Sequence, residues 1–166
     1  RLDEAISEAV AEAVAQLAGR RPDLAVVFVS SAYGEAIRPT LEGVHDLVDA
    51  GCLIGGTAEG VLANAVEYEN GPAVAVWLAS LPQATITPLP LEYSQTADGG
   101  TFLGWPERFT WPADAAVLLL ADPFSFPVDS LISRLADDRP GLPIIGGMAS
   151  GGSRPGGNTL VMDRQT

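Results

Sequence analysis

The sequence carries one strand–helix–strand pattern twice, with the second copy 91 residues after the first. At this offset residues 54–56 align with residues 145–147, both Ile-Gly-Gly, and Ala58 aligns with Ala149. One offset serves the whole stretch, so we expect no net insertion between the copies. Repeated units of this kind favour parallel strands with right-handed crossovers. We therefore predict an α/β fold, with a mixed sheet or sheets built from two repeated β-α-β units and covered by helices.

Apolar periodicity locates the individual elements. Helical spacing predicts amphipathic helices over residues 2–18, over residues 34–48 and from Pro127 onward. Short apolar runs predict strands over residues 24–29, 52–56, 73–81, 84–93, 115–120, 142–147 and 158–163.

Two segments in the middle of the chain have a predicted arrangement of their own. The short turn near Pro82 predicts that residues 73–81 and 84–93 pair as a hairpin, while glycines and prolines make residues 94–112 a connection. Trp77 lies within a predicted strand and is expected in the core. Trp105 and Trp111 fall in the connection, where they either pin the loop or stack on a ligand.

Composition excludes several functions. The chain has no lysine, which excludes Schiff-base, P-loop and catalytic-lysine chemistry. Its net charge of −12 repels phosphate backbones and anionic lipid, so we expect no nucleic-acid partner. No apolar run has the length of a membrane span, and we expect no membrane insertion. A single cysteine cannot form an intramolecular disulfide, and the chain is expected in the cytoplasm.

A glycine-rich segment ends each copy of the pattern, and we expect both segments to form turns. The residues singled out as ligand-binding are Gly55, Gly56, Thr57 and Glu59 in the first segment, and Gly146, Gly147, Ser150, Gly151 and Gly152 in the second. Glycines let a backbone approach a ligand closely, and their N–H groups can bind anions. The alternative is that the glycines only allow the strands to bend where the copies meet. A pseudo-twofold relation between the copies would bring both segments to one cleft.

Three further candidates follow the first strand of the second copy. Asp122, Phe124 and Ser125 come directly after the apolar run, and the carboxyl ends of strands face the ligand crevice in open α/β sheets. For Ser125 the alternative, slightly favoured, is that its hydroxyl caps the helix that starts near Pro127.

Nucleophilic and metal chemistry find little support in the residues. His45 is the only histidine and lies within a predicted helix, and no G-x-S-x-G elbow exists. One cysteine and one histidine cannot build a zinc site, and the glycine segments have neither dinucleotide-binding nor Walker spacing. We expect no metal and no cofactor. Cys52 is expected to be a small buried apolar residue, with a reactive thiol as the alternative.

Four segments together resemble the N-terminal domain of the FIST family. They are DLAVVFVS (23–30), IGGTAEGV (54–61), LLLADPFSFPVD (118–129) and GLPIIGGMASGG (141–152), in this order. The resemblance implies a sensory domain of a signal-transduction protein that binds a small molecule, such as an amino acid. We expect one domain of this kind over residues 1–166, and the internal repeat divides it into halves of about 20–93 and 112–163. A C-terminal FIST domain and a signalling output domain would be its partners in cis.

The expected function is therefore a non-enzymatic small-ligand sensor whose pocket is lined by the candidate residues. A protein–protein interaction module is the alternative, and it predicts an exposed apolar patch without an enclosed pocket. A third hypothesis is that the chain is an enzyme that uses Asp122 or Glu59 as acid or base. A carboxyl group with a raised pKa in the pocket would favour it.

Overall fold

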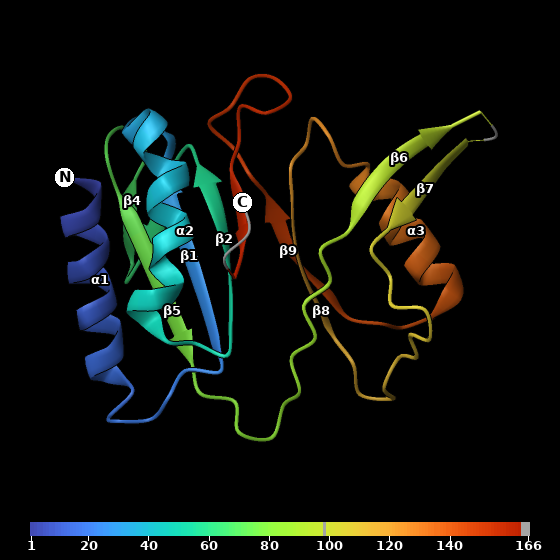
Figure 1. Cartoon of the computed structure of the whole chain (residues 1–166), viewed down its shortest axis with the longest axis horizontal. Helices are drawn as coiled ribbons and strands as arrows, with labels where there is room; N and C mark the ends of the chain where they lie inside the picture. Colours follow the sequence, from blue (N-terminus) through green and yellow to red (C-terminus); the bar gives the residue numbers. More distant parts are fainter. Residues whose placement is uncertain (98, 164–166) are drawn as a thin grey trace.

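The structure is a computed structural model that describes residues 1–97 and 99–163, and these form two lobes side by side (Figure 1). The first lobe holds a four-stranded sheet in the order β10-β2-β1-β5. Its strands are β1 (Leu24–Ser30), β2 (Cys52–Ala58), β5 (Val74–Ala79) and β10 (Leu160–Met162). β1 and β2 are parallel, whereas β5 and β10 are antiparallel to their neighbours. The predicted α/β class with a mixed sheet is confirmed.

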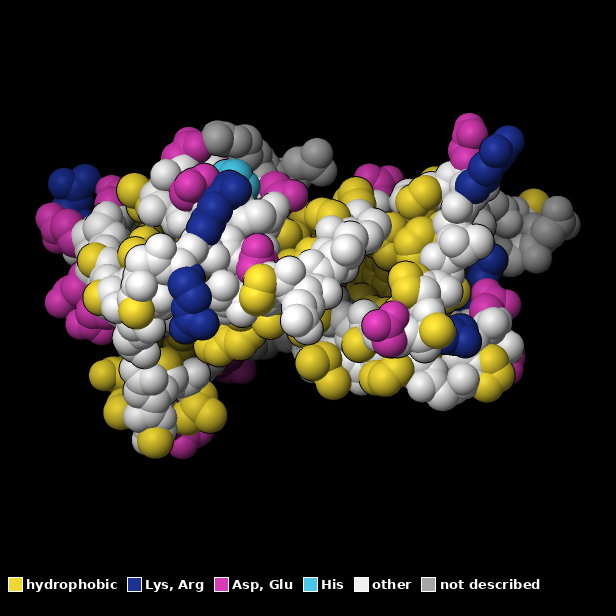
Figure 2. All heavy atoms as spheres, turned by 90° about the horizontal axis from the view of Figure 1, so that it is seen from below, with side chains coloured by type: hydrophobic (Ala, Val, Ile, Leu, Met, Phe, Trp, Pro, Cys, Tyr) yellow, Lys and Arg dark blue, Asp and Glu magenta, His cyan; other side chains and the backbone are white. Residues whose placement is uncertain are grey.

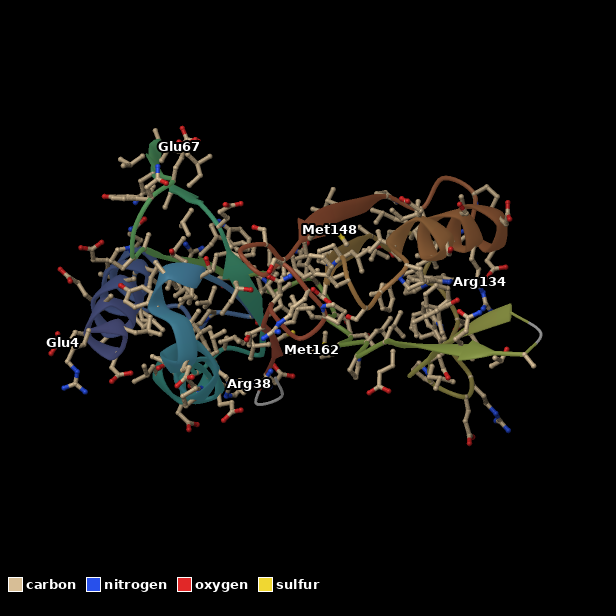
Figure 3. The ribbon with its side chains drawn as sticks, turned by 90° about the horizontal axis from the view of Figure 1, so that it is seen from above. Glu4, Arg38, Glu67, Arg134, Met148 and Met162 are labelled. Atoms are coloured by element: carbon tan, nitrogen blue, oxygen red, sulfur yellow. The ribbon has the colours of Figure 1, made fainter. Side chains whose placement is uncertain are left out.

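Two helices cover one face of this sheet. They are α1 (Leu2–Gln16) and α2 (Ile37–Val48), and a 3-10 turn, η1 (Ser31–Ala36), leads from β1 into α2. Alternate residues of β1, namely Ala25, Val27 and Val29, are fully buried and belong to the same core as the helices. A short hairpin, β3 (Val61–Ala63) with β4 (Val66–Tyr68), lies on the opposite side of the sheet (Figures 1 and 3).

The second lobe is smaller. Its parallel pair is β8 (Val117–Ala121) and β9 (Ile144–Met148), joined by α3 (Val128–Asp138). An antiparallel hairpin, β6 (Glu92–Thr96) with β7 (Gly99–Leu103), packs on α3. The core of this lobe contains the buried residues Phe102, Leu131 and Leu135. Trp105 and Trp111 pack on each other and on Phe109, so the two tryptophans pin the connection, as the first of the two predicted roles requires.

Both lobes contain the predicted strand–helix–strand unit, but the copies differ by one residue. Val27 of β1 pairs with Gly55 of β2, 28 residues later, whereas Leu119 of β8 pairs with Gly146 of β9, 27 residues later. The expectation of no net insertion is therefore wrong. The sequence offset of 91 aligns β2 with β9, but the pairing aligns β1 with β8 one residue further along.

The predicted hairpin over residues 73–81 and 84–93 is also wrong. β5 pairs with β1, and residues 84–91 form no strand. Pro88 and Pro90 lack the N–H that a ladder needs, which explains why pairing starts only at Glu92. The strand that starts at Glu92 is β6, and its partner β7 lies in the segment that was expected to be a connection without strands. Trp77 is 56% exposed and not in the core, because it faces the side of the sheet opposite to the helices.

The last strand joins the first lobe although it follows the second in sequence. β10 pairs antiparallel with β2 and lies between β2 and β9 (Figure 1). The chain therefore crosses between the lobes after β9, so the halves predicted from the repeat are interlocked. Over the residues described, no helix combines the length and apolar character needed to cross a membrane.

Candidate functional site

The two glycine-containing segments lie against each other where the lobes meet. The Ser150 N–H donates to the Thr57 carbonyl at 3.2 Å, and the Glu59 N–H donates to Ser150 Oγ at 2.9 Å. Met148, at the end of β9, lies near this junction in Figure 3. The duplication thus places the carboxyl ends of β2 and β9 together, as the pseudo-twofold argument predicts.

Four of the glycines lie inside strands and not in turns, which corrects the sequence prediction. Gly55 and Gly56 belong to β2, and Gly146 and Gly147 belong to β9. A Cβ atom on Gly55 would lie 2.0 Å from the Val27 carbonyl oxygen, and one on Gly146 would lie 1.8 Å from that of Leu119. These two glycines let adjacent strands approach closely. Their role in binding a ligand stays a prediction.

Gly151 and Gly152 lie in the loop after β9. Gly151 has a φ of +93°, a conformation that side chains disfavour, and a Cβ there would meet the side chain of Ser31 at 2.5 Å. The Gly152 N–H donates to Asn158 Oδ1 at 2.8 Å. Gly151 therefore lets the loop lie against the first lobe, and Gly152 closes the loop on Asn158.

Asn158 is a buried polar residue that connects the two lobes. Its Nδ2 donates to Asp122 Oδ1 at 2.8 Å, and its Oδ1 accepts from the Gly152 N–H and, at 3.4 Å, from the Thr57 hydroxyl. The Asp122 carboxylate can only accept, which fixes the amide orientation. Thr57 belongs to β2 and Asp122 follows β8, so one side chain ties both parallel pairs together.

Asp122 is held by two donors. Ser125 Oγ donates to Asp122 Oδ2 at 2.7 Å, while Asn158 occupies Oδ1. The Ser125 and Phe126 N–H groups both donate to the Asp122 carbonyl, which shapes a tight turn at the end of β8. The capping role predicted for Ser125 is wrong, because the N-cap of α3 is Pro127 and no side chain caps it.

A pocket of about 350 Å³ opens beside this turn. Its walls come from β8, from the segment that leads into β6, and from β10. The lining residues are Leu89, Leu91, Glu92, Tyr93, Leu119, Leu120, Ala121, Asp122, Ser125, Phe126 and Leu160. From below, Figure 2 shows a hollow with hydrophobic walls between the two lobes. The volume lies in the range of small-molecule sites.

The pocket contains some of the predicted residues and several that the sequence did not mark. Asp122 and Ser125 line it, whereas Phe124 is 42% exposed and does not. Thr57 reaches the pocket indirectly, through Asn158 and Asp122. Asn158, Tyr93 and Leu160 were missed, because their positions depend on β6 and β10 packing across lobes, which no local pattern encodes.

The remaining reactive candidates lie in the first lobe. Cys52 is buried, as predicted, and burial followed by the charge of Asp163 raises the pKa of its thiol to about 11. His45 Nε2 lies 4.0 Å from Asp163 Oδ1. Among the described residues no group of three histidine, cysteine or acidic side chains is placed to hold a metal ion.

Two parallel strand–helix–strand units, joined at the carboxyl ends of their strands with a pocket at the junction, define a two-lobed α/β domain. Residues 23–166 match the family described as FIST N domain, and the chain belongs to that family. The resemblance found in the sequence is thus confirmed. Family membership indicates a sensory domain of a signalling protein.

The chain is also similar to curated mycobacterial proteins. It is 42% identical over 160 residues to a Mycobacterium tuberculosis protein named "Uncharacterized protein Rv0628c", covering 96% of this chain and 41% of that protein. It is 38% identical over 149 residues to the Mycobacterium bovis "Uncharacterized protein Mb0898c", covering 89% of this chain and 37% of the relative. The chain thus spans about two fifths of the length of these relatives. No solved structure matches it.

Proposed function

We propose that this domain binds a small molecule, of the class of amino acids and similar metabolites, and acts as a sensor and not as an enzyme. In this proposal it works in the cytoplasm and passes the signal to a domain of the same polypeptide. The observation that carries the proposal is the pocket beside Asp122, which is bounded by both lobes. A ligand there contacts β8 and β10 together, so binding changes how firmly the lobes are held to each other.

The hydrogen bonds of Asp122 support binding more than acid–base catalysis. Both carboxylate oxygens already accept from protein donors, Asn158 and Ser125, and this fixes the side chain in one orientation. A preorganised polar group in an apolar pocket is typical of a binding site. Glu59, the other candidate acid or base, is exposed and outside the pocket lining.

A pocket-filling variant tests the proposal. Leu89 lines the pocket from a segment without regular structure, so Leu89→Trp should fill the volume with little effect on the sheets. Leu81→Trp is the matched control, since Leu81 lies in the same connecting segment but outside the pocket lining. In a thermal-shift screen with amino acids and small metabolites at millimolar concentration, a ligand should raise the Tm of the wild type and of Leu81→Trp only. A screen without any hit on the full-length protein would refute the proposal.

A protein-interaction role is the second candidate, and an exposed apolar surface favours it. The β3–β4 hairpin exposes Leu62 (72%), Val66 (48%) and Tyr68 (54%), and Trp77 of β5 is 56% exposed on the same side of the sheet. Exposed apolar patches mark interaction surfaces. The partner that we propose is a C-terminal FIST domain in cis, because the relatives contain more than twice the length matched here.

Hydrogen exchange tests this interface. The amides of residues 61–68 should exchange fast in the 166-residue chain and at least about tenfold more slowly in the full-length protein, where the partner covers them. The amides of β6 and β7, which lie in the other lobe, serve as the internal control. Equal exchange of the hairpin in both proteins would exclude it as the docking surface.

A further inference from the structure

The polar groups of the pocket point to one chemical class of ligand. We propose that the pocket takes a molecule with a protonated amine on a small apolar body, and that it excludes carboxylates of the same shape. This inference rests on the proposed binding function and narrows the ligand class from amino acids and similar metabolites to amines that carry no carboxylate. It is carried by the direction of the hydrogen bonds around the pocket and by the charges that line it.

The side-chain donors of the pocket are already used by the protein. The Ser125 hydroxyl proton is donated to Asp122, and the Tyr93 hydroxyl proton is donated to Gln95 Oε1 at 3.0 Å. The Ser125 oxygen keeps a free lone pair, so toward a ligand this hydroxyl acts as an acceptor, whereas the Tyr93 hydroxyl lies against Gly100 of the β6–β7 hairpin and offers the ligand no donor. Asp122 and Glu92 supply two carboxylates, which accept only.

Asp122 retains acceptor capacity after its protein contacts. Each of its oxygens accepts one hydrogen bond, from Asn158 or from Ser125. A carboxylate has about four acceptor positions, so each oxygen has room for one more donor. An ammonium group carries three donors and no acceptor, which complements this set.

The charge of the pocket favours a cation. Among the described residues no arginine lines it, and the full sequence carries a net charge of −12 without any lysine. An anionic ligand would have to lose water next to two carboxylates with no opposite charge to compensate. An amine instead gains an ion pair in an apolar surrounding, where the pair is screened less than in water.

The apolar residues that line the pocket determine which apolar group of a ligand fits there. Leucine side chains from three separate segments, together with Phe126, form the walls. Phe126 is itself fixed by its contact with Phe102, at 5.4 Å between ring centres. A phenyl or isobutyl group fits a cavity of about 350 Å³ with these walls.

Matched probes that differ only in the polar group test the inference. The first set is 2-phenylethylamine, 2-phenylethanol and 3-phenylpropionate, and the second is isopentylamine, isopentanol and 4-methylpentanoate. Calorimetric titration at pH 7 should show that the amine of at least one set binds at least about tenfold more tightly than its alcohol, with no detectable binding of the acid. Raising the salt concentration should weaken the binding of the amine.

Two variants connect the selectivity to the proposed groups. Glu92→Gln removes an exposed carboxylate that has no hydrogen bond or ion pair within the described part of the chain, so the fold should be retained. Glu92→Gln should lower the affinity for the amine severalfold, and Asp122→Asn should lower that affinity by about tenfold or more. Asp129→Asn, at an exposed site in the first turn of α3, is the control and should leave affinity unchanged.

The possible outcomes distinguish failure of the proposed amine class from failure of the proposed binding function. An acid or alcohol that binds as well as the amine overturns the amine class and leaves the binding function standing. Full amine affinity in both Glu92→Gln and Asp122→Asn overturns it as well. If no probe binds and the wider screen of amino acids and metabolites is also silent, the binding function itself fails.

Discussion

At the scale of single residues, Cys52 shows how burial sets chemistry. It lies at the start of β2 with 4% of its surface exposed. Burial, and then the negative charge of Asp163, raises the pKa of the thiol from its ordinary value of 9.0 to about 11. The thiol is therefore protonated at neutral pH and a poor nucleophile. Of the two roles predicted for Cys52, the structure supports the small buried residue.

This pKa gives a prediction about stability at alkaline pH. A folded-state pKa above the unfolded value contributes stability that is complete below about pH 9 and is lost as the pH rises through about 11. Two pKa units correspond to about 2–3 kcal/mol. Urea unfolding between pH 8 and pH 11 should show a steeper loss of stability for the wild type than for Cys52→Ala. The two proteins differ only at this thiol, so parallel profiles would contradict the prediction.

Asn158 and Asp122 give a second prediction at this scale. Asn158→Asp removes the donor to Asp122 and places a second carboxylate beside it, at a buried position. We expect a loss of about 2–4 kcal/mol in the free energy of unfolding. Adding Asp122→Asn restores a donor and acceptor across the same contact, so the double variant should recover more than half of the loss. A double-mutant cycle in urea measures this coupling, and additive losses would mean that the contact carries none.

At the scale of elements, the four glycines inside β2 and β9 do not all have the same role. Gly55 faces the Val27 carbonyl at a distance that admits no side chain, whereas a Cβ on Gly147 meets nothing within 4 Å. Gly55→Ala should therefore separate β1 from β2 and cost about 3 kcal/mol or more. Gly147→Ala should change stability by less than about 0.5 kcal/mol. Chemical denaturation of the two variants compares them, and similar losses would show that close approach is not the reason for Gly55.

The same elements show what the sequence can and cannot predict. The helices and the strands β1 and β8 follow from local periodicity, and the repeat correctly brings the carboxyl ends of β2 and β9 together. Pairing that spans distant parts of the chain has no local signal: β10 joins β2 across about 100 residues. Trp77 appeared to be a core residue because its strand is apolar, but exposure depends on which face the helices cover. The pocket was missed in part for the same reason, since β6 and β10 complete it.

At the scale of the whole molecule, the two lobes are stabilised unequally. The first core contains buried residues from two helices and three strands, and Ile6, Val27, Leu41 and Leu53 among them are fully buried. The second has three buried residues, and its parallel pair leaves Leu118 41% and Ile145 67% exposed. Strands of a parallel pair are usually covered on both faces. The second lobe is therefore the part expected to open first.

Native-state hydrogen exchange should resolve this difference. Amides of β1 and β2 should open only with global unfolding, whereas those of β8 and β9 should open by a lower-energy local route. Because β8 lines the pocket, a ligand bound there should slow exchange in β8 and β9 far more than in β1 and β2. The measurement is exchange as a function of low denaturant concentration, with and without 2-phenylethylamine. Equal opening free energies in both lobes would mean that Asn158 and β10 couple them into one cooperative unit, and ligand binding would then stabilise the entire chain and not the second lobe alone.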